Sequence, residues 1–181
     1  MSRHRIRTAA AGAIILILAL LGSATPASAG TLDVTCTPPS SVAVTYDPPL
    51  TASPQTVTST TNQQYGPCVS ASVPGLTSGS RFTVVTSSGL SCLELLAARP
   101  FGFTITWNTG QTSTISGNLV ANLSGGVLTV TVTGTVTSGL FAGDTVVQQQ
   151  VGAATDLTLC TLGQGTVSSH YGLVTLEITS V

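Results

Sequence analysis

Charged side chains are scarce in this chain: of its 181 residues only 6% are Asp, Glu, Lys or Arg, and lysine is absent. Residues 30–181 contain two arginines, Arg81 and Arg99, against six acidic residues. Proteins that bind nucleic acids or anionic lipids do so through clusters of Lys and Arg. The composition therefore argues against both kinds of partner, and its 42% hydrophobic residues argue against a disordered polyelectrolyte.

The first 29 residues differ from the rest of the chain. Three arginines precede an apolar run at residues 13–21, and Ala27-Ser28-Ala29 supplies a small-residue cleavage site. This order is typical of a secretory signal peptide. We expect residues 1–29 to be removed and residues 30–181 to form a single domain, secreted and extracellular, with no membrane attachment after cleavage.

All four cysteines lie in this second part: Cys36, Cys68, Cys92 and Cys160. An even number of cysteines in an exported chain predicts disulfides, here two. A zinc site is not expected, because zinc ligands tend to come in close pairs such as C-x-x-C. Even the nearest two cysteines, Cys68 and Cys92, are 24 positions apart. Four cysteines allow three pairings, and the residues alone leave all three open.

Apolar residues alternate with Thr and Ser along most of residues 30–181, a period of two that indicates β-strands. Within residues 128–137 the apolar side chains share one face and the threonines the other, and Gly134 marks a bulge or a close strand approach. Only residues 92–98 suggest a helix. The expected fold is all-β, a two-sheet antiparallel β-sandwich. Eleven segments are expected as strands: 32–37, 42–46, 56–60, 67–72, 82–86, 101–107, 112–123, 127–137, 145–150, 156–162 and 173–179.

Candidate catalytic groups are few. His170 is the only histidine in residues 30–181 and is expected in a solvated loop, because serines and a glycine flank it. No G-x-S-x-G nucleophile elbow, phosphate-binding glycine loop, dinucleotide fingerprint or calcium loop is present. We therefore expect no catalytic residues, no cofactor and no metal. A glycosidase-like carboxylate pair would have to come from five scattered acids: Asp33, Asp47, Glu94, Asp144 and Asp156.

Aromatic residues are also few, at 4% of the chain. Phe82 and most of the others are expected in the core, which leaves Tyr65 and Tyr171 as exposed rings for stacking on a sugar. The threonine row from Thr129 to Thr137 offers a flat polar face, but Thr is common on exposed β faces by propensity alone. Neither feature favours a lattice-binding protein or a carbohydrate-binding module over a plain β domain.

The spacing of Cys92, Trp107 and Cys160 resembles that of immunoglobulin domains, in which the tryptophan packs on a disulfide between two sheets. A second resemblance is to small secreted actinobacterial β-sandwich proteins of uncharacterised function. Together they imply an immunoglobulin-like or related Greek-key sandwich and supply no catalytic residues. The second resemblance is carried by four segments: 91–93, 103–110, 134–144 and 159–160.

The immunoglobulin resemblance favours a disulfide between Cys92 and Cys160. Cys36 shares the inward parity of Val34, and Cys68 lies two to three strands later, where a meander or small Greek key returns to its start. The expected disulfides are therefore Cys36–Cys68 and Cys92–Cys160.

The sequence predicts a secreted, non-catalytic protein that binds an extracellular ligand or protein or has a structural role, without identifying the partner. An enzyme is not expected. The alternatives from other classes are a secreted hydrolase that uses a carboxylate pair or His170, and a carbohydrate-binding module.

Overall fold

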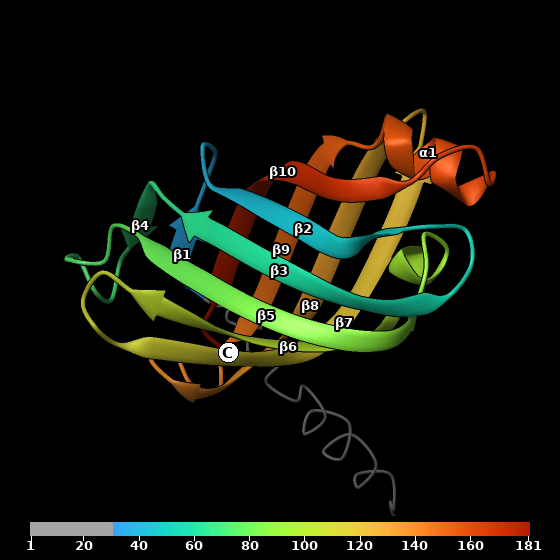
Figure 1. Ribbon diagram of the computed structural model, residues 1–181. Coiled ribbons are helices and arrows are strands. Elements are labelled where there is room, and N and C mark those ends of the chain that lie inside the picture. The colour runs from blue at the N-terminus through green and yellow to red at the C-terminus, as the bar shows by residue number, and fades with distance from the viewer. Residues whose placement is uncertain (1–30) are drawn as a thin grey trace, which may run out of the picture.

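The computed structural model describes residues 31–181, which fold into ten strands, one 3-10 helix and one α-helix (Figure 1). The predicted signal peptide, residues 1–29, lies outside the described residues. The elements in chain order are β1 (Leu32–Cys36), β2 (Ser41–Leu50), β3 (Gln55–Tyr65), β4 (Cys68–Ser70), β5 (Gly79–Leu90), η1 (Glu94–Leu96), β6 (Arg99–Trp107), β7 (Thr112–Ser124), β8 (Val127–Gly139), β9 (Thr145–Ala153), α1 (Thr155–Thr161) and β10 (Val167–Thr179).

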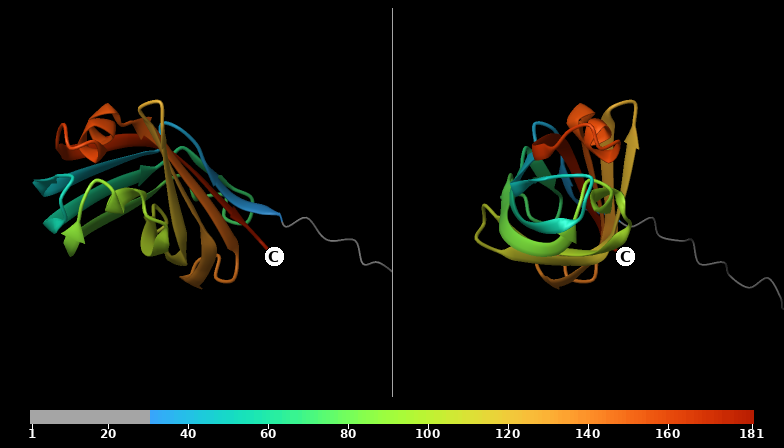
Figure 2. Two further views of the ribbon diagram at one scale, coloured as in Figure 1. Left: turned by 90° about the vertical axis from the view of Figure 1, so that its right-hand side faces the viewer. Right: turned by 45° about the vertical axis from the view of Figure 1, so that its right-hand side comes forward.

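Eight of the ten strands close into an antiparallel β-barrel in the order β2-β3-β5-β6-β7-β8-β9-β10. Closure depends on β10, because its residues 173–179 pair with β9 and its residues 167–173 pair with β2. In the right-hand view of Figure 2 the strands surround a common axis. The expected two-sheet sandwich, whether immunoglobulin-like or Greek-key, is therefore wrong.

The alternation of apolar and polar residues that predicted the strands is confirmed. In β8, Leu128, Val130 and Val132 are buried, whereas Thr133 and Thr135 on the other face are exposed. A sandwich and a barrel both bury one face of each strand, so this alternation is the same in either fold. The two folds differ in which strands pair, and the β2–β10 pairing joins strands that lie far apart in the sequence.

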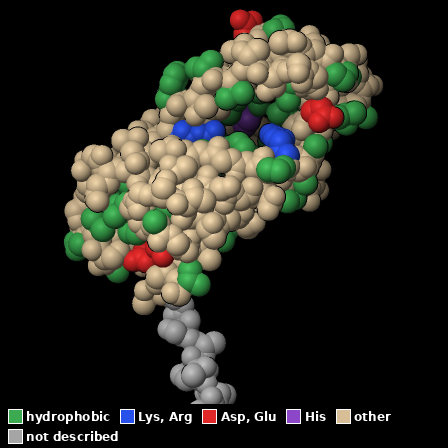
Figure 3. Space-filling model, turned by 90° about the horizontal axis from the view of Figure 1, so that it is seen from below, with side chains coloured by type: hydrophobic (Ala, Val, Ile, Leu, Met, Phe, Trp, Pro, Cys, Tyr) green, Lys and Arg blue, Asp and Glu red, His purple; other side chains and the backbone are tan. Residues whose placement is uncertain are grey.

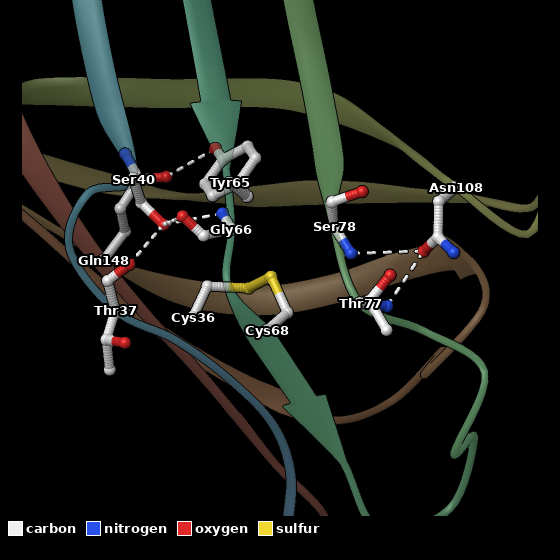
Figure 4. Close-up of a disulfide and its surroundings, with 10 residues drawn as sticks. All are labelled: Cys36, Thr37, Ser40, Tyr65, Gly66, Cys68, Thr77, Ser78, Asn108 and Gln148. Carbon is white, nitrogen blue, oxygen red and sulfur yellow. Dashed lines mark hydrogen bonds between the residues drawn. A yellow bond between two sulfur atoms is a disulfide. The ribbon is translucent and has the colours of Figure 1, made fainter.

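Strands β1 and β4 extend the sheet outside the barrel: β1 pairs with the last residues of β10, and β4 pairs with β1. Cys36 and Cys68 lie opposite each other in the β1–β4 pair and form a disulfide (Figure 4). Beside it, Ser40 Oγ accepts a hydrogen bond from the Gly66 amide (2.7 Å) and donates to the Thr37 carbonyl oxygen (2.7 Å). These contacts join the turn before β2 to the turn after β3.

Residues 156–162, expected as a strand, instead form most of helix α1. The buried residues of this helix are Leu157 and Cys160, which are three positions apart and so share one helical face. The helix suggested by residues 92–98 is present only as the short η1. In residues 156–161 the spacing of Leu157 and Cys160 fits a helix, and the strand expected there is wrong.

Cys92 and Cys160 form the second disulfide, which joins the β5–β6 connection to α1. Both predicted pairings are thus confirmed, although the sandwich geometry that favoured one of them is not. Two disulfides fit an oxidising, extracellular environment. Within residues 31–181, no helix has the length and apolar character needed to cross a membrane.

Strands β7 and β8 approach each other closely where Gly117 lies opposite Gly134. A Cβ atom on Gly134 would collide with backbone atoms of Ser116 and Gly117. The close strand approach expected at Gly134 is therefore confirmed, while the register irregularity of this pair lies elsewhere, between Thr114 and Ile115.

Candidate functional site

The barrel interior is filled at one end and hollow at the other. At the filled end Tyr65 and Trp107 are each 2% exposed, and their ring centroids are 6.4 Å apart. Tyr65 Oη donates to Gln148 Oε1 (2.7 Å), and Trp107 Nε1 donates to Ser113 Oγ (2.8 Å). These buried, hydrogen-bonded side chains form the floor of the hollow part.

Beyond this floor lies a cavity of about 450 Å³ that is open to solvent. Figure 3 looks onto it, with arginine side chains (blue) at its edges and a histidine (purple) between them. All eight barrel strands contribute inward-facing side chains to the cavity wall. The wall consists of Val42, Val44 and Tyr46 of β2, Ser59, Thr61 and Gln63 of β3, Arg81, Thr83, Val85, Ser87, Ser88, Gly89 and Leu90 of β5, Arg99 and Phe101 of β6, Leu119 of β7, Leu128 and Val130 of β8, Gln150 of β9 and His170 of β10, with Glu94 and Leu95 of η1 at the rim.

Arg81 places a buried cation in this wall and is only 9% exposed. Its guanidinium carbon lies 5.1 Å from the ring centroid of Phe101 and 4.9 Å from that of Phe103. Its Nε donates to Thr83 Oγ1 (3.2 Å), and its terminal nitrogens make no hydrogen bond within residues 31–181. Burial lowers the pKa of Arg81, but an arginine side chain remains protonated at neutral pH.

Gln63 lies directly opposite Arg81 in the β3–β5 pair and is fully buried. Its Nε2 donates to Gln148 Oε1 (3.1 Å), whereas its Oε1 has no hydrogen-bond partner in the described part of the chain. Buried polar atoms are rarely left without a partner. The region next to the floor therefore holds hydrogen-bonding capacity that residues 31–181 do not use.

Arg99 and Glu94 lie at the rim of the cavity. Arg99 Nη1 donates to the carbonyl oxygens of Glu94 and Ala97, both at 3.3 Å, and is thereby fixed to the η1 turn. Glu94 is the only acid that lines the cavity. Within residues 31–181, which contain all six acids of the chain, no carboxylate lies within 4.0 Å of the guanidinium nitrogens of either arginine.

His170 is part of β10 and lines the cavity, so the solvated loop position expected for it is wrong. Its Nδ1 lies 3.2 Å from Tyr46 Oη. Burial lowers the pKa of His170 and raises the pKa of Tyr46, so this hydrogen bond joins a neutral imidazole to a neutral phenol, and the imidazole tautomer sets which of the two donates. The inward position was visible in the sequence, since His170 has the parity of the buried Val174, Leu176 and Ile178.

The catalytic groups considered from the sequence are not assembled. Tyr46 is the only hydrogen-bond partner of His170 within the described residues, so no Ser–His–acid triad is formed. Of the candidate acids Glu94 alone lines the cavity, and Asp144 lies beside Asp33, where burial and the Asp33 charge raise the pKa of Asp144. Residues 31–181 hold no group of three or more His, Cys, Asp or Glu side chains that could bind a metal. The remaining acids are exposed: Asp47 and Asp156.

Two of the predicted aromatic positions are wrong. Tyr65, expected at the surface, is buried in the floor, and Phe82, expected in the core, is 70% exposed. Phe82 alternates with Arg81 and Thr83, whose side chains face inward, so strand parity places its ring outside. Tyr171 is 57% exposed, as expected. These exposed rings lie outside the cavity and form no sugar-stacking surface within it.

Comparisons of the chain with protein-family models, with curated proteins and with solved structures found no match.

Proposed function

We propose that the protein is a secreted, non-catalytic binding protein whose barrel interior holds a small molecule. The observation that carries this proposal is the open cavity of about 450 Å³ beyond the Tyr65–Trp107 floor. Small-molecule sites are typically clefts of about 300–1,000 Å³ that combine apolar walls with a few polar groups. This cavity has both: Leu119, Leu128 and Val130 are apolar, and the side chains of β3 and β5 are largely polar.

Export is part of the proposal. It is supported by the signal-peptide pattern of residues 1–29 and by the two disulfides, since disulfides persist mainly in oxidising compartments.

A binding role is favoured over hydrolysis by the environment of His170. A nucleophile has to be activated by an adjacent base or by a lowered pKa. The only hydrogen-bond partner of His170 in the described part of the chain is the Tyr46 phenol, and burial raises the pKa of that phenol, which disfavours the phenolate. Carbohydrate binding is disfavoured because both aromatic rings of the cavity wall already have a partner. The Arg81 guanidinium lies over Phe101, and Tyr46 is stacked with His170.

The test is a titration with N-phenyl-1-naphthylamine, an uncharged apolar dye whose fluorescence rises in apolar surroundings. Two matched variants locate its site: Thr61→Phe fills the cavity, and Thr60→Phe adds the same ring on the outer face of β3. We expect saturable binding that Thr61→Phe weakens by about 10-fold or more, equivalent to about 1.4 kcal/mol, and that Thr60→Phe leaves unchanged.

The proposal is wrong if the dye does not bind saturably, or if both variants weaken binding equally. Thermal unfolding confirms that each variant is folded, and Thr83→Phe, on the residue opposite Thr61, repeats the test from β5.

A further inference from the structure

The guanidinium of Arg81 presents an unused and oriented edge to the cavity. Contacts with the Phe101 and Phe103 rings, together with the hydrogen bond from Nε to Thr83 Oγ1, hold the plane of the group. Its two terminal nitrogens have no hydrogen-bond partner within residues 31–181. The paired N–H groups of a fixed guanidinium match the two oxygens of a carboxylate.

The protein does not balance the charge of Arg81. All six acids of the chain belong to the described residues, and none is within 4.0 Å of the guanidinium nitrogens. Aromatic faces attract a cation, but they offset only part of the free energy lost when a charge is taken out of water. An anionic group in the cavity would provide the missing partner.

Arg99 is a different kind of cation. It is bonded to two backbone carbonyl oxygens of the η1 turn, and it shares the cavity rim with Glu94. The positive and negative charges at the rim therefore offset each other in part, and Arg81 is left to bind one negative charge.

The cavity has a polar side next to Arg81 and an apolar side along β7 and β8. Gln63, directly opposite, is a fully buried polar side chain, so the cavity is polar beside the guanidinium. Its unpartnered Oε1 accepts hydrogen bonds and does not donate them, so the donors for a carboxylate come from Arg81. The wall contributed by β7 and β8 consists of Leu119, Leu128 and Val130. A ligand that suits both sides has a polar head and an apolar body.

Building on the proposed function, we infer that the ligand is an amphipathic monocarboxylic acid whose carboxylate is held by Arg81 next to the cavity floor, with its apolar body against β7 and β8. The ligand is then recognised by a bidentate, charge-assisted pair of hydrogen bonds.

Three probes of equal chain length test this inference by displacing N-phenyl-1-naphthylamine: decanoate, decan-1-ol and decylammonium. We expect the wild-type protein to bind decanoate about 10- to 100-fold more tightly than decanol, and decylammonium more weakly than both. Arg81→Gln should bring decanoate to within about 2-fold of decanol, and Arg81→Lys should restore only part of the difference, since Lys lacks the planar fork. Arg99→Gln should weaken decanoate binding less than Arg81→Gln does.

Equal binding of decanoate and decanol by the wild-type protein, or a preference for decanoate that survives Arg81→Gln, overturns the inference and leaves the proposed function intact. Failure of all three probes to displace the bound dye also overturns it. Failure of the dye itself to bind counts against the proposed function. If Arg81→Gln does not fold, the wild-type probe series and Arg81→Lys decide the question.

Discussion

Gln63 and Arg81 lie directly opposite each other on β3 and β5, and both line the cavity. The next inward pair, Tyr65 and Gly79, belongs to the packed end, where a Cβ atom on Gly79 would contact the Trp107 ring at 2.7 Å. The barrel thus changes from filled to hollow within one step along these two strands. The buried cation Arg81 lies at that boundary, and its terminal nitrogens make no hydrogen bond to the described residues.

The two disulfides are predicted to have different effects on binding. Replacing either pair by alanine should lower the free energy of unfolding, by at most about 3.5 to 4.5 kcal/mol for loops of 32 and 68 residues. Only Cys92–Cys160 joins the η1 connection, which carries the cavity rim, to α1. Dye titration should therefore show weaker binding for Cys92→Ala/Cys160→Ala and a change within about 2-fold for Cys36→Ala/Cys68→Ala. Equal losses in the two variants would contradict this difference.

His170 should make stability depend on pH. An unfolded histidine has a pKa of about 6.5, and burial lowers the pKa in the fold. Below about pH 6.5 the unfolded chain therefore binds more protons than the folded one, and stability falls as pH falls. In urea unfolding between about pH 7.5 and pH 5, the wild-type protein should lose more stability than His170→Gln.

His170→Gln serves as the control because it lacks only the imidazole and retains the other titratable groups near the site: Tyr46, Arg81, Glu94, Arg99 and Asp156. Parallel stability curves for the two proteins would show that His170 titrates as freely in the fold as in the unfolded chain.

Because β7 and β8 approach each other closely, adding a single methyl group at Gly134 should lower the stability of the fold. In Gly134→Ala the new Cβ would collide with backbone atoms of Ser116 and Gly117. We expect a loss of about 1–3 kcal/mol in the free energy of unfolding. Gly75→Ala is the matched control, since no atom lies within 4 Å of its new Cβ, and it should change stability by less than about 0.5 kcal/mol. Similar values for the two variants would refute the tight β7–β8 contact.

The seam between β5 and β6 should be the least protected part of the barrel. These strands pair only at Gly79–Trp107 and Ser80–Thr106, so the rest of each facing edge is unpaired. By contrast, β8 is paired along most of its length with both β7 and β9. Hydrogen exchange should be faster for amides of residues 81–90 and 99–105 that face the seam than for those of β8. Uniform protection would mean that the seam is closed in solution.

Strand parity, as read from the sequence, identified much of the barrel interior. The apolar row of β8 is buried as predicted. The predictions for Phe82 and His170 are wrong because they follow residue type and neighbouring residues instead of strand parity. The alternation of inward and outward side chains along β5 and β10 by itself places Arg81 and His170 in the interior. Both side chains belong to the polar part of the cavity wall.

No local sequence pattern predicts that the sheet closes into a barrel. Closure requires the first half of β10 to pair with β2 and the second half to pair with β9, so that Leu173 pairs with Ser41 on one side and Val151 on the other. Each strand buries one face in a sandwich as in a barrel, so alternation carries no information about this pairing. The cavity follows from closure, which is why the sequence predicts a binding or structural role without indicating a cavity.

The most direct test of the account is to locate the bound dye. Intermolecular nuclear Overhauser effects between N-phenyl-1-naphthylamine and methyl-labelled protein distinguish the inner from the outer face of the same barrel. The account predicts contacts from the dye to methyl groups of Val44, Leu119 and Val130, which line the cavity. Contacts confined to Val84 and Val147, which are 54% and 46% exposed on the outer face, would contradict it.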